Sequence, residues 1–303
     1  MGGHAVATVT RSESPAGQSQ CDVVSWRQEG DRFGTRDGAN VRLRRAVGRR
    51  PCASGDDAIG AMLEVVSESL CDLVDLHAGA RVLDVAAGTA TCSLAAARRR
   101  CEVTSIDEAP AGLEHGRRRA AADRLTIRFQ QAHAEALPFA ARVFDVVLSM
   151  FGVMFAPNHV RAASELVRVC RPFGRIGLAN WTPQGFMGRM LTVVSDHAPR
   201  PPGLTPATLW GLDDHLDRLF YGSAWDLHTN RRDFVFRCRS AAHCLDMIRT
   251  CNGPVGKAFT GLSADKQRRL EQDMFYLIDD FNISTNSTVV IPSEYVEVVV
   301  VKK

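Results

Sequence analysis

The chain has 303 residues, 45% of them hydrophobic, and carries a formal net charge of +3 at pH 7 with a sequence pI near 8.4. This length and composition suit one large α/β domain with additions, and the chain is long enough to bury a full hydrophobic core. The net charge is too mild for a nucleic-acid-binding surface, and no run of about 18 apolar residues offers a membrane span.

Nine cysteines are spread along the chain without Cys-x-x-Cys spacing. An odd number without such pairs fits neither a disulfide framework nor a zinc site. The first ten residues have no basic region that leads into an apolar one, so we expect no signal peptide. We therefore expect a protein of the reducing cytoplasm with no metal site, and either a monomer or a homodimer.

Residues 1–55 are rich in Gly, Ser, Arg and Asp and show little periodicity. They predict an irregular N-terminal arm, which could serve as a lid over a cofactor. From residue 56 to Leu76 the apolar residues recur at spacings of three and four, which predicts an amphipathic helix that ends at Gly79.

Strand and helix patterns then alternate as far as residue 180. We expect strands at 81–86, 102–106, 126–130, 143–149 and 174–180, and helices at 90–99, 110–123 and 159–171. This alternation predicts a parallel sheet with helices on both faces over residues 56–180, and ligands bind such sheets beyond the carboxyl ends of the strands.

After Trp181, prolines and aromatic residues interrupt the pattern up to about residue 232, which predicts an inserted helical cap over 181–232. Residues 233–303 are expected to return to the core, with strands at 233–238 and 294–300 and helices at 241–251 and 264–280. The predicted fold is therefore α/β: a Rossmann-like, doubly wound, mostly parallel seven-stranded sheet with an inserted helical cap.

The turn after the first strand is the most informative segment. Gly88 lets a ligand approach the backbone of this turn, and Asp107 follows nineteen residues later at the end of the next strand. A carboxylate in that position can accept hydrogen bonds from both hydroxyls of a ribose. The pattern favours a nucleoside site, although an ordinary turn with a surface aspartate would look similar.

Further motifs follow in order. They are Val82-Leu83-Asp84, Ile106-Asp107, Ala134-Glu135-Ala136-Leu137-Pro138-Phe139, Phe144-Asp145-Val146-Val147 and Arg171-Pro172-x-Gly174-Arg175. This series resembles the class I S-adenosylmethionine-dependent methyltransferases, especially the ubiquinone/menaquinone C-methyltransferase-like (methyltransferase type 11) group. The resemblance covers roughly Arg81 to Trp181, and the remainder is similar to small-molecule members more loosely.

The resemblance implies S-adenosylmethionine as the cofactor. The positions that would contact it are Asp84, Ala86, Ala87, Gly88, Asp107, Glu108, His133, Ala134, Glu135, Ser149, Met150 and Phe151. Asp84 and the turn would flank the methionine part, Asp107 the ribose and His133 the adenine, while Phe151 would lie next to the methyl donor. Because a positively charged sulfur is already a good leaving group, alignment of the acceptor does most of the catalytic work.

Three positions depart from the family pattern. Ala86 and Ala90 stand where many members have glycine, and a left-handed alanine costs about 1–2 kcal/mol. His133 stands where an aspartate usually accepts from the adenine amino group, and a neutral imidazole can accept only through one nitrogen. Loss of a charge-assisted hydrogen bond is worth about 1.5–3 kcal/mol.

Met154, Phe155, Trp181 and Trp210 are the residues expected to line an apolar acceptor site. A general base, if the acceptor needs one, would come from His197, His215 or Tyr221. The predicted function is methyl transfer to a carbon or oxygen of a small, partly apolar acceptor that is quinone-like, phenolic or a secondary metabolite. Two alternatives stay open: a degenerate methyltransferase fold that binds the cofactor without methyl transfer or catalyses another reaction, and a nicotinamide-dependent oxidoreductase, which the lone Gly88 disfavours.

Overall fold

A computed structural model of the chain describes residues 58–198, 204–220, 225–250 and 254–302. The expected N-terminal arm over residues 1–55 lies outside these described residues. Tyr221, one of the three expected bases, also lies outside them.

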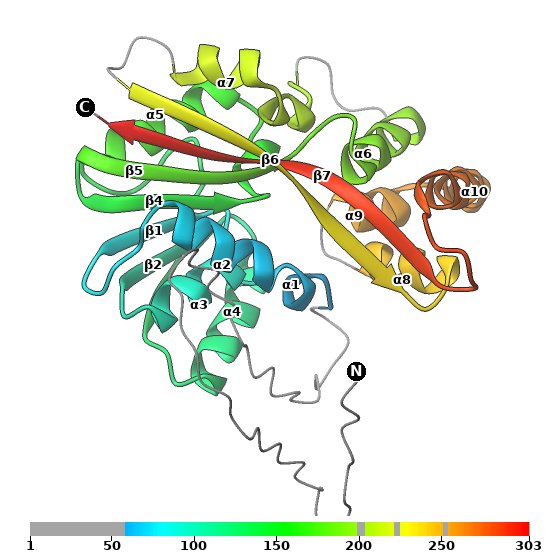
Figure 1. Cartoon of the computed structure of the whole chain (residues 1–303), viewed down its shortest axis with the longest axis horizontal. Helices are drawn as coiled ribbons and strands as arrows, with labels where there is room; N and C mark the ends of the chain where they lie inside the picture. The colour runs from blue at the N-terminus through cyan, green and yellow to red at the C-terminus, as the bar shows by residue number, and fades with distance from the viewer. Residues whose placement is uncertain (1–57, 199–203, 221–224, 251–253, 303) are drawn as a thin grey trace, which may run out of the picture. The chain divides into compact units, whose positions relative to one another are not determined.

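Within the described ranges, seven strands form one sheet in the order β3-β2-β1-β4-β5-β7-β6 (Figure 1). The first five strands run parallel, whereas β7 is antiparallel to both β5 and β6. The bounds are β1 Arg81–Val85, β2 Glu102–Asp107, β3 Ile127–Gln131, β4 Phe144–Met150, β5 Cys170–Trp181, β6 Trp225–Cys238 and β7 Val289–Lys302. The predicted Rossmann-like, mostly parallel seven-stranded sheet is confirmed.

Two groups of helices cover the sheet. Helix α2 (Glu64–Leu73) packs on α3 (Thr91–Arg98) and β5, while α4 (Pro110–Ala122) packs on β2 and β3. Helix α5 (His159–Val169) packs on β4, β5 and α7 (Asp213–Phe220). Figure 1 shows α2 in front of the sheet and α5 behind it. Three short helices complete these layers: α1 Ala58–Met62, η2 Val153–Phe155 and η3 Ala207–Gly211.

The hairpin of β6 and β7 extends beyond the rest of the sheet. The first residues of β7 pair only with β6, and β7 pairs with β5 from Tyr295 onward. Strand β6 begins at Trp225, eight residues before the expected start. Those eight residues include polar and charged side chains and lie on the outer strand, so no apolar alternation marks them in the sequence.

Four helices gather beside this extension of the hairpin (Figure 1). They are α6 Phe186–His197, α8 Ala241–Thr250, α9 Pro254–Gly261 and α10 Ala264–Phe281. Aromatic rings join them to the hairpin, since Phe186 packs edge-on against both Phe236 of β6 and Phe281 of α10. Only α6 comes from the range expected for the cap, and the other three lie between β6 and β7 in the chain.

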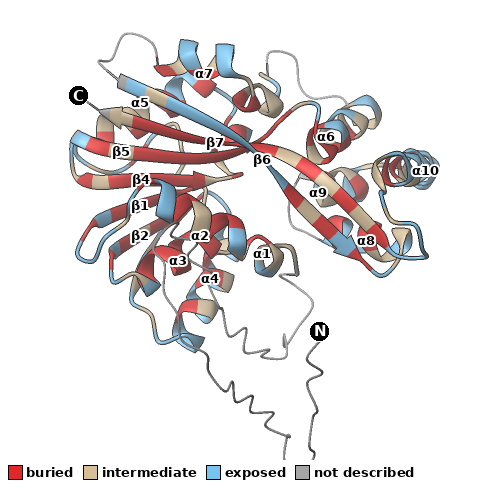
Figure 2. Ribbon diagram, viewed as in Figure 1, coloured by how far each residue is buried: buried red, intermediate tan, exposed pale blue. Residues whose placement is uncertain are grey.

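The core runs through the middle of the sheet, where β1, β4, β5 and β7 are buried along most of their length (Figure 2). Helix α3 is buried almost completely between α2 and the strands, and its run of alanines lets the helices approach closely. The six cysteines in the described part of the chain are buried free thiols. None of the helices in that part is long and apolar enough to cross a membrane.

Candidate active site

The turn between β1 and α3 contains three residues in the left-handed conformation: Ala86 (φ 54°), Gly88 (φ 54°) and Ala90 (φ 64°). Apart from Gly88 itself and its two chain neighbours, no atom of the described residues lies within 4 Å of the position that a Cβ at Gly88 would occupy. The turn therefore leaves open space over its central backbone, as a closely bound ligand requires.

Neighbouring glycines accommodate the methyl groups of the two left-handed alanines. A Cβ at Gly152 would lie 2.8 Å from the Cβ of Ala86, and a Cβ at Gly116 would lie 2.8 Å from the Cβ of Ala90. Real side chains do not approach this closely, so each alanine occupies room that a neighbouring glycine leaves. Ala90 is fully buried, and burial of its methyl group offsets part of the conformational cost.

Asp107 lies at the end of β2 and joins the turn to the next helix. Its Oδ2 accepts from the backbone N–H of Gly88 at 2.8 Å, and its Oδ1 accepts from the backbone N–H of Ala109 at 2.8 Å. A carboxylate has about four acceptor positions, so each oxygen can still accept a hydroxyl. The predicted ribose contact of Asp107 is compatible with this geometry.

Asp84 is a carboxyl group inside the core of the sheet. Burial raises its pKa to about 7, although a hydrogen bond from the Ser93 hydroxyl at 2.6 Å opposes the shift. Its second oxygen and the hydroxyl of Ser105, the residue opposite it on β2, are buried without hydrogen-bond partners among the described residues. Unpaired polar atoms beneath a turn with open space indicate a site that a polar ligand would complete.

His133 uses both ring nitrogens within the protein. Its Nδ1 accepts from the backbone N–H of Glu135 at 3.3 Å, and its Nε2 lies 3.4 Å from the carboxylate of Glu108. With Nδ1 as the acceptor the ring proton is on Nε2, so the imidazole offers no free acceptor to an adenine amino group. The carboxylate of Glu135 is also engaged, because it accepts from the backbone N–H of Asn158 at the start of α5.

A side-chain hydrogen bond joins the end of β4 to the end of β1. The buried Ser149 hydroxyl donates to the carbonyl of Val85 at 2.7 Å and accepts from the N–H of Val153 at 2.9 Å. Phe151 follows with a left-handed backbone (φ 56°), and its ring stacks on Trp181 at 3.9 Å with an interplanar angle of 5°. The predicted donor residue Phe151 and the predicted acceptor residue Trp181 therefore lie together at the strand ends.

The other expected acceptor residues are placed differently. Met154 is fully buried and Phe155 is 40% exposed. Trp210 is fully buried in η3, and its indole N–H has no hydrogen-bond partner in the part of the chain that the structure describes. The ring of Trp210 packs near His159 and Phe220. The structure thus places Trp210 in the layer formed by α5 and α7, whereas Trp181 packs with Phe151.

Both described histidines that we expected as bases have protein partners. His197 pairs with Asp273 of α10 at 2.6 Å. His215 lies 3.0 Å from His159. Burial lowers the pKa of His159 to about 4 with a further contribution from His215, and burial also lowers the pKa of His215. The pairing of His197 with a second helix and the contact of His215 with the buried His159 point to structural roles for both expected bases.

Known proteins resemble this arrangement. A family model described as a methyltransferase domain matches residues 82–174, which contain the turn and the ends of β2, β3 and β4. The Mycobacterium tuberculosis H37Rv protein named Uncharacterized protein Rv1403c is 39% identical over 219 residues, which cover 71% of this chain and 80% of that protein. The chain belongs to one family with this mycobacterial protein, and its residues 82–174 belong to the methyltransferase domain family. The family resemblance predicted from the motifs is confirmed.

Two further proteins are similar to parts of this chain. The demethylmenaquinone methyltransferase of Clavibacter sepedonicus is 40% identical over 135 residues, which cover 43% of this chain and 55% of that protein. The crystal structure of the YcgJ protein from Bacillus subtilis superimposes with a TM-score of 0.54 at 17% identity, over 79% of this chain and 99% of that one. The second similarity is one of fold.

One cavity next to the strand ends involves residues that the sequence did not single out as site residues. It has a volume of about 440 Å³ and lies between α2 and the hairpin of β6 and β7. Its wall includes Val65, Val66, Ser69, Arg232, Phe234 and Tyr295. Tyr295 packs edge-on against both Phe151 and Trp181. The signal available in the sequence was Glu297, a charged residue between Val296 and the run of valines at 298–301.

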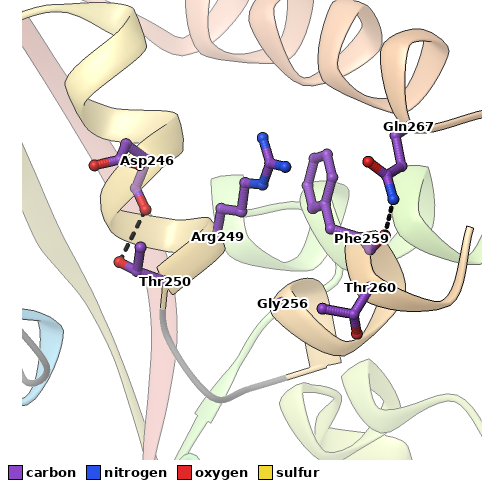
Figure 3. Close-up of a pocket in the computed structure, with 7 residues that line it drawn as sticks. All are labelled: Asp246, Arg249, Thr250, Gly256, Phe259, Thr260 and Gln267. Carbon is purple, nitrogen blue, oxygen red and sulfur yellow. Dashed lines mark hydrogen bonds between the residues drawn. The ribbon is translucent and has the colours of Figure 1, made fainter. Parts of the chain in front are cut away.

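A second cavity of about 260 Å³ lies among α8, α9 and α10 (Figure 3). The guanidinium of Arg249 lies over the ring of Phe259, 4.6 Å from its centroid, and Gln267 donates to the Phe259 carbonyl. This cavity shares no lining residue with the strand ends, so it is not part of the donor site.

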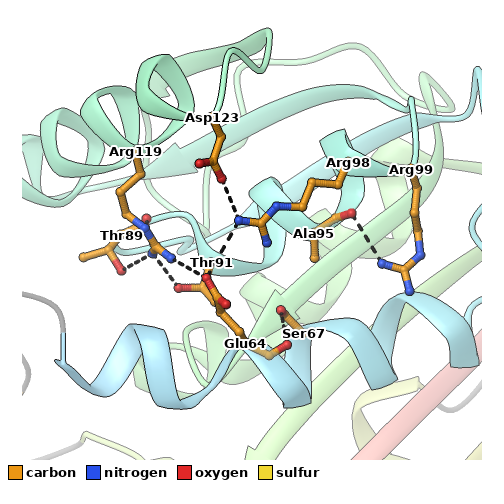
Figure 4. Close-up of polar contacts among 9 residues, drawn as sticks. All are labelled: Glu64, Ser67, Thr89, Thr91, Ala95, Arg98, Arg99, Arg119 and Asp123. Atoms are coloured by element: carbon orange, nitrogen blue, oxygen red, sulfur yellow. Dashed lines mark hydrogen bonds and ion pairs between the residues drawn. The ribbon is translucent and has the colours of Figure 1, made fainter. Parts of the chain in front are cut away.

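Arg119 of α4 contacts both helix α2 and the turn between β1 and α3, which we call the donor turn (Figure 4). Its guanidinium donates to the Thr91 hydroxyl at 2.8 Å and to the Thr89 carbonyl at 3.1 Å, and it pairs with Glu64 of α2 at 3.2 Å. One side chain therefore holds the turn, α4 and α2 together. The sequence did not reveal this role, because 55 residues separate Arg119 from Glu64.

Proposed function

We propose that the protein is a class I methyltransferase that transfers the methyl group of S-adenosylmethionine to a carbon or oxygen of a small, partly apolar acceptor. One observation carries the proposal: the open space over Gly88 lies directly beside the carboxylate of Asp107. An acceptor that is quinone-like, phenolic or a secondary metabolite suits the aromatic residues near the strand ends. The similarity to a demethylmenaquinone methyltransferase supports the quinone-like option.

The residues at the turn fit the cofactor. Asp107 has free acceptor positions for the ribose hydroxyls, and Gly88 leaves room for the chain that leads to the sulfur. The unpaired oxygen of Asp84 and hydroxyl of Ser105 are polar groups beneath the turn that a polar ligand would satisfy. When bound, S-adenosylmethionine supplies an electrophilic methyl group on a positively charged sulfur.

The chain contributes alignment and exclusion of water. With both ligands bound, the cofactor would supply an electrophilic methyl carbon, and the residues of the chain would hold the acceptor oxygen or carbon in line with it. The stacked rings of Phe151 and Trp181 form an apolar wall at this point. Burial raises the pKa of the Tyr295 phenol, which keeps this side chain protonated and argues against it as a base.

The reaction is tested by incubating the protein with S-adenosylmethionine and a panel of phenols, quinols and enolic carbon acceptors. The proposal predicts that S-adenosylhomocysteine is released only when a suitable acceptor is present. Bound but intact cofactor with every acceptor would instead favour the degenerate fold, which the engaged ring nitrogens of His133 support.

We also propose a cytoplasmic protein, a monomer or homodimer, whose partner is a small molecule and not a nucleic acid. The buried free thiols in the described part of the chain and the net charge of +3 support this setting.

A further inference from the structure

A row of side chains crosses the sheet from the donor side to its outer strand. Phe151 at the end of β4 stacks on Trp181 at the end of β5. Trp181 is opposite Tyr295 on β7, and Tyr295 is opposite Arg232 on β6. Directly opposed residues project from the same face of a sheet. The row therefore runs from the residue expected beside the methyl donor into the 440 Å³ cavity under α2.

Arg232 is held in place by a buried carboxylate. Its Nε donates to Oε2 of Glu297 at 2.6 Å, and Glu297 is fully buried. The other oxygen of Glu297 accepts from the hydroxyls of Ser69 at 2.7 Å and Tyr295 at 3.3 Å. Because this bond fixes the guanidinium through Nε, its two terminal nitrogens keep one orientation and form a fork that can bind a carboxylate with two hydrogen bonds.

That fork has no partner within the described residues. The Arg232 side chain is 49% exposed, and its terminal nitrogens have neither an ion pair nor a hydrogen bond there. Arg231, the preceding residue, is different, because it pairs with Asp213 at 3.0 Å and with Glu294 at 3.4 Å. Arg231 and Asp233 also line the cavity, but strand alternation directs their side chains toward the opposite face from Arg232.

Apolar and aromatic side chains line the cavity beside Arg232 and the Ser69 hydroxyl. Phe234 and Tyr295 supply rings from the hairpin, and Val65 and Val66 supply branched aliphatic side chains from α2. A volume of about 440 Å³ suits a molecule of one or two rings. Flat apolar walls with one oriented guanidinium complement a planar body that carries a single anionic group.

We propose that this cavity binds the methyl acceptor, and that the acceptor is a planar aromatic carboxylate whose acid group forms a bidentate pair with Arg232. This proposal rests on the proposed function, since it names the substrate class of the same site. Arg232 is a specificity-determining residue here: it anchors the acid group at the outer end of the row, while the opposite end of the acceptor lies toward Phe151.

The test compares cinnamate with cinnamamide, which has the same planar shape without the charge. Binding is measured by calorimetry on the full chain in the presence of S-adenosylhomocysteine, so no turnover is needed. Wild-type protein is expected to bind cinnamate more tightly than cinnamamide by about tenfold or more, because the charged bidentate pair is lost with the amide. Equal binding of the two probes, or no binding of either, would overturn the proposal.

Two single variants and one double variant test whether Arg232 causes the preference for cinnamate. Arg232→Gln should remove the preference for cinnamate, whereas Arg231→Gln, which changes the same charge on the adjacent residue, should retain it. Arg232→Gln leaves the buried carboxylate of Glu297 without its partner and could therefore unfold the protein. The double variant Arg232→Gln/Glu297→Gln removes both charges and avoids this problem. Circular dichroism checks that it is folded. Retention of the preference in the double variant would contradict the role of Arg232.

The outcome is separable from that of the proposed function. Cinnamate binding that depends on Arg232, without methyl transfer to any aromatic acid, would retain the anion site and remove the acceptor assignment, while the panel of phenols, quinols and enolic carbon acceptors would still test the transfer reaction. Methyl transfer to uncharged acceptors that is insensitive to Arg232→Gln would retain the reaction and overturn this inference.

Discussion

At the scale of single residues, Asp84 makes the stability of the fold depend on pH. Burial raises its pKa to about 7, so the folded state holds a proton that the unfolded state releases near the ordinary value of 3.8. The stability contributed by the protonated group is therefore fully present below about pH 4 and is lost as the pH rises to about 7. The difference between these two pKa values corresponds to on the order of 4 kcal/mol.

Asp84→Asn should abolish this pH dependence while keeping an acceptor for the Ser93 hydroxyl. Urea unfolding at several pH values between 4.5 and 8 measures it: the variant should gain stability relative to wild type by a few kcal/mol as the pH rises. Asp123→Asn is the control, because Asp123 lies near the surface in an ion pair with Arg98. Parallel curves for wild type and Asp84→Asn would show that Asp84 is ionised in the folded state.

The residue scale also shows what the sequence could predict. Gly88 and Asp107 could be assigned because each sits at the end of a strand that local apolar runs identify. The contact between Ser69 and Glu297 could not, because 228 residues separate them and only the pairing of β5 with β7 brings them together. The partners of His133 were equally hidden, since they depend on how the chain turns after β3.

At the scale of elements, the turn between β1 and α3 has residues in the costly left-handed conformation and leaves open space beside Gly88. Gly88→Ala should destabilise the fold by about 1–2 kcal/mol through the left-handed backbone, and its methyl group should also enter the space predicted for the cofactor. Gly79→Ala is the matched control, because Gly79 has φ +81° and equally open surroundings but precedes β1 at its opposite end.

Thermal unfolding and titration with S-adenosylhomocysteine measure the two effects separately. Both variants should lose similar stability, and only Gly88→Ala should lose affinity for the ligand. Equal affinity of the two variants would remove the turn from the binding site.

The element pattern also explains which boundaries were predictable. The parallel strands β1, β2, β4 and β5 are largely buried and are therefore marked by apolar residues in the sequence. Strand β3, the edge strand beside β2, also lies close to its predicted range although it is partly exposed. The prediction placed the start of β6 eight residues too late. The first half of β6 is held by backbone pairing with β7 at the outer edge of the sheet, and its side chains show no apolar pattern that would mark a strand. After β6, helices α8 and α10 were predicted from the sequence and α9 was not. The packing of α9 and α10 on α6 depends on the extended hairpin.

At the scale of the whole molecule, the candidate site is assembled from segments that are distant in the sequence. The donor side comes from residues 84–151, which the methyltransferase family model covers. The acceptor side comes from α2 and from the hairpin of β6 and β7, which lie outside that range. This division explains why the motifs indicate the cofactor and not the acceptor.

Binding of the cofactor is the central claim, and calorimetric titration of the full chain with S-adenosylhomocysteine tests it most directly. The account predicts saturable binding that weakens by about 1.5–3 kcal/mol in Asp107→Ala and is unchanged in Asp123→Ala, whose aspartate lies at the far end of α4. The absence of heat at high micromolar ligand, from protein shown to be folded, would contradict the account, as would an unchanged affinity in Asp107→Ala.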